Sequence, residues 1–148
     1  MGRVLALDIG ERRIGVAVSD EIGVLAQPLM VIQRQGVAQD IAHILQLVRE
    51  RGVETVVVGL PVTLRGGQAQ AAEKVEEFVS CLREALGTPI VLVDERLSTA
   101  EADRRMREAD VRRGKRRRSV DAVAAALILE RYLGRQRAGL DGEAKHAP

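Results

Sequence analysis

The stretch Arg3–Ser19, RVLALDIGERRIGVAVS, decides the fold of this 148-residue chain. Its first half is a short apolar run that ends in Asp8, a pattern typical of a buried strand. From Ile14 onward, apolar residues alternate with small ones, which indicates a second strand. The intervening Gly10–Arg13 leaves room only for a tight turn. We therefore predict a β-hairpin with a carboxylate at the end of its first strand.

Working outward from the hairpin, the apolar pattern predicts the remaining elements. A third strand is expected at Val24–Gln33, where Pro28 favours the edge of a sheet. Apolar residues at helical spacing, followed by a glycine, mark helices, and Val-rich runs mark the other strands. The expected helices are Val37–Arg51, Gln68–Leu86, a helix capped by Ser98 or Thr99 that runs to about Ala109, and Val120–Leu133, capped by Ser119 and ended by Gly134. The expected strands are Glu54–Leu60 and Pro89–Asp94.

The order βββαβαβαα implies an α/β domain, a mixed sheet flanked by helices. A length of 148 residues with 46% apolar content fits one such domain. We assign residues 1–134 to this domain. Residues 135–148 are polar and rich in Gly and Ala, so we expect a mobile C-terminal tail.

The composition excludes several classes of protein. A single cysteine, Cys81, excludes an intramolecular disulfide and a cysteine-based zinc site, and we expect it to be buried or half-buried. No apolar run approaches the ~18 residues of a membrane span, and no signal-peptide pattern is present. We therefore expect a cytoplasmic protein without a membrane partner. Only one Phe and one Tyr argue against binding single strands by base stacking.

The charge of the chain is unevenly distributed. The net charge is +2, yet Arg104–Arg118 holds nine basic and two acidic residues, a local charge of +7 that leaves −5 elsewhere. Charge runs of this kind are often solvated surface. A concentrated basic stretch also favours a polyanion such as nucleic acid as the partner.

Acidic residues lie where α/β folds concentrate chemistry. Asp8 ends the first strand, Asp94 and Glu95 end the fifth, and Asp121 lies in the first turn of the last helix. Binding sites form outside the carboxyl ends of strands. Carboxylates there suit Mg²⁺ or Mn²⁺, and two such ions can promote phosphodiester hydrolysis. Adjacent strand residues point to opposite faces, so at most one of Asp94 and Glu95 joins this cluster. Asp121 has a simpler interpretation as a charge favoured at a helix N-terminus.

Four blocks of sequence together resemble one known family. In order, they are LDIGERRIGVAVSD, VVVGLPVTLRGG, VDERLSTAEA and SVDAVAAALIL, and they extend over Arg3 to about Leu133. They resemble the YqgF/RuvX-type family, described as Holliday junction resolvases and as pre-16S rRNA nucleases.

The resemblance implies an RNase H-like fold with sheet order 3-2-1-4-5 and a nuclease site that depends on divalent metal, with two Mg²⁺ or Mn²⁺ ions. It implies that Asp8, Glu95 and Asp121 are the catalytic metal ligands. Gly10 and Gly15 correspond to the glycines of the first hairpin, and Gly59, Leu60 and Pro61 correspond to the GLP motif. Polar positions that line the same end correspond to Arg13, Arg96 and Thr99.

The basic stretch fits this site as a guide for phosphates. It runs directly into the helix of Asp121, and we expect it to form a loop that positions the nucleic-acid backbone. The residues expected to contact nucleic acid there are Arg112, Arg113, Lys115, Arg116, Arg117 and Arg118.

The leading hypothesis is a hydrolase, a metal-dependent nuclease acting in 5′-end processing of pre-16S rRNA during ribosome biogenesis. An alternative is a Holliday junction resolvase acting on branched DNA, which would need a homodimer to cut both strands symmetrically. An alternative of another class is a non-catalytic RNA-binding factor in ribosome assembly. The LDIG segment also resembles the phosphate-binding hairpin of actin-like ATPases. Those proteins need two such domains, which 148 residues cannot hold.

Overall fold

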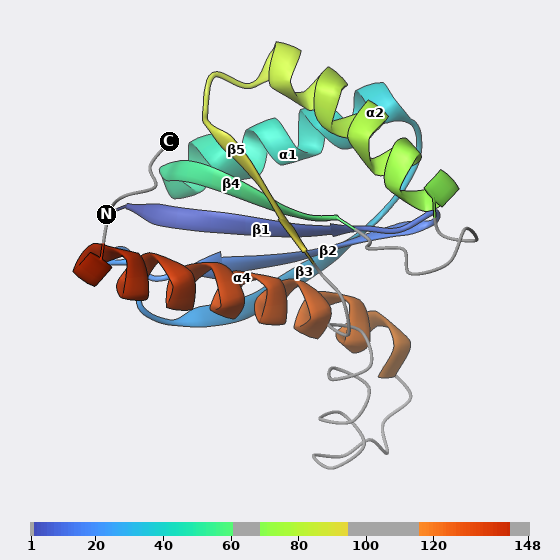
Figure 1. Ribbon diagram of the computed structural model, residues 1–148. Helices are drawn as coiled ribbons and strands as arrows, with labels where there is room; N and C mark the ends of the chain where they lie inside the picture. Colours follow the sequence, from blue (N-terminus) through green and yellow to red (C-terminus); the bar gives the residue numbers. More distant parts are fainter. Residues whose placement is uncertain (1, 61–68, 95–115, 143–148) are drawn as a thin grey trace.

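The computed structural model describes residues 2–60, 69–94 and 116–142 of the chain (Figure 1). These ranges form five strands and three helices, and the first three elements are strands. In chain order they are β1 (Arg3–Ile9), β2 (Arg13–Ser19), β3 (Ala26–Gln33), α1 (Val37–Arg51), β4 (Val53–Leu60), α2 (Ala69–Ala85), β5 (Ile90–Asp94) and α4 (Arg116–Gly142).

The strands form one mixed sheet in the order β3-β2-β1-β4-β5. The first three strands pair antiparallel, while β4 and β5 run parallel to β1. This confirms the predicted α/β architecture and its 3-2-1-4-5 order. β3 lies at the edge, and its register against β2 shifts beside Pro28, which has no N–H to give to the ladder.

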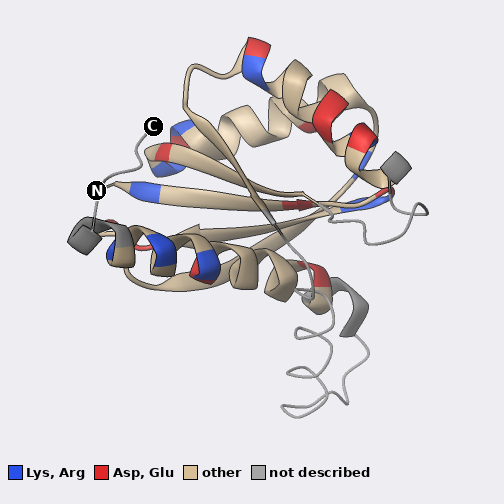
Figure 2. Ribbon diagram, in the orientation of Figure 1, with Lys and Arg blue, Asp and Glu red and all other residues tan. Residues whose placement is uncertain are grey.

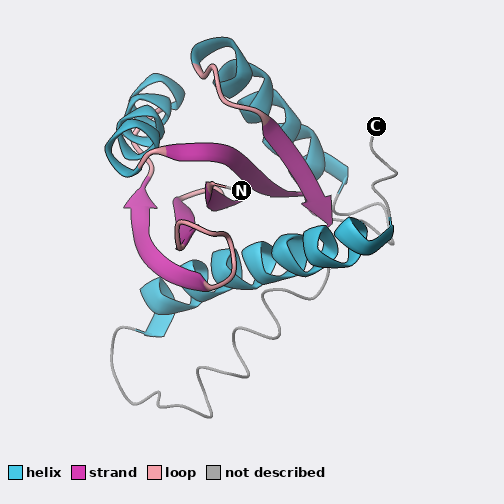
Figure 3. Ribbon diagram, turned by 90° about the vertical axis from the view of Figure 1, so that its left-hand side faces the viewer, coloured by secondary structure: helices cyan, strands magenta, loops and turns pink. Residues whose placement is uncertain are grey.

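The sheet separates two apolar layers (Figures 1 and 3). Helices α1 and α2 cover one face, where Ile44 and Leu82 join Leu7 in the larger core. Helix α4 covers the other face, where Ile128 packs in a cluster with Ala6. Because side chains alternate along a strand, the even-numbered residues of β1 face α4.

The last helix differs from its prediction at both ends. α4 begins at Arg116 and continues through Gly134 to Gly142, so the predicted cap at Ser119 and the end at Gly134 are wrong. A glycine inside a helix costs only about 1 kcal/mol, and burial of neighbouring Leu133 can offset that cost. Arg116–Arg118 therefore belong to the helix and not to a loop.

Cys81 is exposed, against the prediction that it is buried or half-buried. The apolar stripe of α2 passes through Phe78, Val79 and Leu82, which are buried, and position 81 points away from it. α1 ends as predicted at Gly52, which has the left-handed φ of 63° typical of a helix C-cap.

Some predictions lie outside the described residues. They concern Pro61, the helix expected to run to about Ala109, and most of the basic stretch. The division into a domain at 1–134 and a tail at 135–148 stays a prediction. None of the helices in the described ranges has both the length and the apolar character needed to span a bilayer.

Candidate active site

Asp8 lies near the carboxyl end of β1, on the face that α4 covers. Val4 and Ala6, four and two residues earlier, pack in the α4 cluster, so alternation turns Asp8 toward the same helix. Its side chain is half-buried. On β2 its cross-strand partner is Gly15.

Gly15 allows α4 to approach the hairpin very closely. A Cβ at this position would overlap the carbonyl oxygen of Asp121 and would lie 3.1 Å from the backbone nitrogen of Ala122. Directly paired residues of antiparallel strands have Cα atoms about 5 Å apart. Asp8 and Asp121 therefore flank the same spot on the sheet. Figure 2 shows the acidic part of β1 and the first acidic part of α4 at the same end of the molecule.

Arg13 forms an ion pair with Asp121. Its Nε lies 2.6 Å from Oδ2 of the carboxylate, and the two side chains are 32% and 26% exposed. Arg13 extends from the start of β2 on the face of Gly15, two residues away. The pair joins residues 108 positions apart in the sequence.

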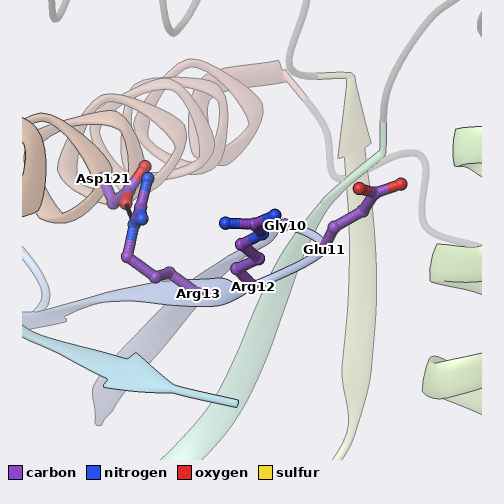
Figure 4. A pocket seen from close by; sticks show the side chains of 5 residues that line it. All are labelled: Gly10, Glu11, Arg12, Arg13 and Asp121. Carbon is purple, nitrogen blue, oxygen red and sulfur yellow. Dashed lines mark hydrogen bonds and ion pairs between the residues drawn. The ribbon is translucent and has the colours of Figure 1, made fainter.

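An open pocket of about 240 Å³ lies beside this pair. Figure 4 shows Arg13 directed toward Asp121 and Glu11 on the other side of the pocket. Glu11 lies 3.8 Å from Nζ of Lys74 on α2. The exposed guanidinium of Arg12 has no ion-pair or hydrogen-bond partner among the residues described. The lining residues are Gly10, Glu11, Arg12, Arg13 and Asp121.

The turn that carries these residues is held by Arg34. Its Nη1 donates to the carbonyl of Gly10 at 2.9 Å, and its backbone N–H donates to the carbonyl of Arg12 at 2.9 Å. Its Nε donates to Oδ2 of Asp40 at 3.0 Å. Asp40 is only 2% exposed, and its other oxygen accepts from the backbone of Gln35. The buried carboxylate thus fixes the arginine that fixes the turn.

The structure brings together part of the predicted site. Asp8, Gly10, Arg13, Gly15 and Asp121 meet at one end of the sheet. Gly59 lies in β4, adjacent to β1, and pairs with Val93 of β5. Outside the described residues lie Glu95, Arg96, Thr99, Arg112, Arg113 and Lys115. Arg116, Arg117 and Arg118 are placed only as the first turn of α4.

The predicted group of three carboxylates stays a prediction, because one member, Glu95, lies outside the described residues. Within the described ranges, no three residues among His, Cys, Asp and Glu are grouped to hold an ion. Three residues of this end of the sheet were not predicted from the sequence: Arg12, Arg34 and Asp40. The signal for Arg12 was its place beside Arg13 in the hairpin turn. Arg34 and Asp40 carry no local signal, because their role depends on packing between distant elements.

The chemistry of this end of the sheet suits a divalent cation and a phosphate. Two half-buried carboxylates are the hard oxygen donors that Mg²⁺ and Mn²⁺ prefer, and Mg²⁺ often uses only one or two of them beside substrate phosphates. An arginine such as Arg12, which has no side-chain partner among the described residues, can form a fork of hydrogen bonds to phosphate oxygens. The residues present therefore fit a metal ion.

The sheet order β3-β2-β1-β4-β5, with carboxylates at the end of β1 and the start of the last helix, is that of the RNase H-like fold. Solved structures with this fold include Thermus thermophilus RuvC in complex with a Holliday junction substrate. It has a TM-score of 0.58 and 17% identity over 93% of this chain and 96% of its own. The fowlpox virus resolvase bound to Holliday junction DNA has a TM-score of 0.54 and 10% identity over 90% and 98%.

Residues 2–135 match the family described as RuvX, Holliday junction resolvase, and the chain belongs to this family. Two relatives carry the name "Putative pre-16S rRNA nuclease". The protein of Desulforudis audaxviator is 44% identical over 137 residues, 93% of this chain and 97% of its own length. That of Halothermothrix orenii is 45% identical over 134 residues, 90% and 96% of the two chains.

Proposed function

We propose that this chain is a metal-dependent nuclease that processes the 5′ end of pre-16S rRNA in the cytoplasm. The observation that carries this proposal is the close approach of α4 at Gly15, which brings Asp121 beside Asp8 and next to the exposed Arg12. The names of the relatives at 44% and 45% identity support precursor rRNA as the substrate.

In this proposal Asp8 and Asp121 hold Mg²⁺ or Mn²⁺, and Glu95 supplies the third carboxylate. Val91 and Val93 of β5 pack on the α4 side of the sheet, so alternation turns Asp94 toward the other side. This periodicity favours Glu95 over Asp94. When bound, a pair of such ions would supply an activated water and positive charge at the leaving oxygen.

Arginines of the hairpin and the basic stretch bind the phosphates of the substrate. Arg12 faces solvent at the rim of the pocket, where an incoming phosphate would meet it first. Its fixed position depends on the hydrogen bond from Arg34 to the carbonyl of Arg12. The remaining phosphate contacts in this proposal come from Arg13, Arg96, Thr99, Arg112, Arg113, Lys115, Arg116, Arg117 and Arg118.

A cleavage panel tests the proposal. The protein, with Mg²⁺ or Mn²⁺, is offered a pre-16S rRNA fragment with its 5′ extension, a four-way DNA junction, a DNA duplex and a single strand. We expect cleavage of the precursor RNA and its loss in Asp121→Asn, which keeps an oxygen for Arg13 but removes the charge. Glu11→Gln is the matched control, because this carboxylate lines the same pocket but is 82% exposed and paired with Lys74. Cleavage of no substrate would refute a nuclease.

The same panel separates the alternatives. The family description supports resolution of four-way DNA junctions as the second candidate function. That function requires a homodimer, because two active sites must make paired cuts. Junction cleavage without RNA cleavage would establish that function instead. A non-catalytic role in ribosome assembly predicts that Asp8→Asn still supports growth in cells. Failure of that folded, RNA-binding variant to complement would exclude the non-catalytic role.

A further inference from the structure

Arg13 is bound to the carboxylate that a metal ion would need. Its contact with Asp121 runs through Nε to Oδ2 alone. Within the described part of the chain, no other hydrogen bond or ion pair involves the two terminal nitrogens of this guanidinium. Both side chains are partly exposed, and both line the open pocket (Figure 4).

The position of this pair matters because Asp8 lies just across Gly15 from Asp121. Two carboxylates gathered on one face repel each other, and a nearby cation reduces that repulsion. Arg13 supplies this cation from the adjoining strand end. A divalent ion shared by the two carboxylates would also reduce their repulsion, and it carries twice the charge of the guanidinium.

We propose that Arg13 is an exchangeable counter-ion for Asp121. In the metal-free protein it holds the carboxylate; when a divalent ion binds, it gives up that contact and turns its guanidinium to a substrate phosphate. This inference rests on the metal site of the proposed function. It adds that metal binding makes the arginine available to the nucleic acid.

The alternative is that Arg13 merely positions Asp121 as a ligand, and the two roles have opposite effects on metal affinity. Losing a positioning partner weakens metal binding, commonly 10- to 100-fold. Losing a competing cation strengthens it. A single-point contact between partly exposed groups is weak and easily exchanged. A positive charge about 5 Å from a metal ion opposes its binding, and we estimate roughly a tenfold effect at this exposure.

The test measures Mn²⁺ affinity of the full chain by electron paramagnetic resonance, without substrate. We expect Arg13→Gln to bind Mn²⁺ roughly tenfold more tightly than wild type. Arg12→Gln is the matched control, because Arg12 lines the same pocket and forms no ion pair with a carboxylate of the described residues. The Mn²⁺ affinity of this variant should change less than about twofold. Unchanged or weaker binding by a folded Arg13→Gln variant would overturn the inference.

A second measurement needs no variant. The Nε–H of Arg13 in the wild-type protein is followed by NMR while Mg²⁺ is added. We expect its protection from solvent exchange to disappear as the metal saturates, since its bond to Asp121 is lost. Persistent protection would show that the pair survives and would contradict exchange. The Asp121→Asn variant tests the proposed metal site itself. Mn²⁺ affinity equal to that of wild type in this variant would refute the site.

Discussion

Replacing Gly15 with alanine tests whether the approach of α4 builds the site. The new methyl group would strike the carbonyl group of Asp121 and crowd the nitrogen of Ala122. These are backbone atoms, so the helix must retreat by about 1 Å or more to restore ordinary contacts. Overpacking costs about 1–3 kcal/mol, and we place this substitution near the upper end because no side chain can rotate away. The smaller entropy of the unfolded alanine chain returns about 0.4–1 kcal/mol.

The expected net loss in the free energy of unfolding is about 2 kcal/mol, or a Tm lower by about 6 °C. Urea and thermal denaturation measure both. Gly134→Ala is the control in the same helix, because a Cβ there meets nothing within 4 Å and alanine favours a helix, so this variant should gain about 0.5–1 kcal/mol. Mn²⁺ affinity should also fall in Gly15→Ala, because Asp121 moves away from Asp8. A Gly15→Ala protein as stable as wild type would refute the reasoning.

Other predictions concern the support of the turn, acid stability and nucleic-acid binding. Asp40→Asn should lower the free energy of unfolding by about 2–3 kcal/mol in urea denaturation, because Arg34 loses its buried charged partner, and an effect below about 0.5 kcal/mol would contradict this role. The backbone N–H groups of Leu25 and then Val24 lower the pKa of Asp20 below 3.8. The stability that the ionised Asp20 adds is present above pH 3.8 and is lost as the pH falls through its lowered pKa. The Asp20→Asn variant should therefore lose less stability in acid than wild type. An NMR titration that finds an unshifted pKa for Asp20 would exclude this effect. Arg12→Gln should weaken RNA binding and reduce its salt dependence by about one phosphate contact, and an unchanged slope would remove Arg12 from the interface.

The sequence predicts the sheet well because each strand has a local signature. The alternation after Ile14, the Val-rich run of β4 and Pro28 at the edge depend only on neighbouring residues. The end of α4 was mispredicted because one glycine inside a helix costs only about 1 kcal/mol, so Gly134 does not stop it. Residues 135–138 are exposed, and their Arg, Gln and Ala side chains favour a helix locally.

Within the site, the resemblance located Asp8 and Asp121 by their motifs. It could not reveal that Arg13 pairs with Asp121, because that contact depends on how α4 crosses β2 at Gly15. The role of Arg34 was hidden for the same reason. Its contacts with Gly10 and with the buried Asp40 exist only after β3 and α1 have packed.

The separation of 108 residues between Arg13 and Asp121 has a consequence for synthesis of the chain. Translation adds about 5–20 residues each second, so roughly 5–20 s pass between the emergence of the two halves of the site. The β1–β2 hairpin can form early, yet its partner carboxylate arrives only with the last helix. A product that stops before α4 lacks Asp121. Interrupted fragments of the chain therefore lack one of the two carboxylates that the proposed nuclease site needs.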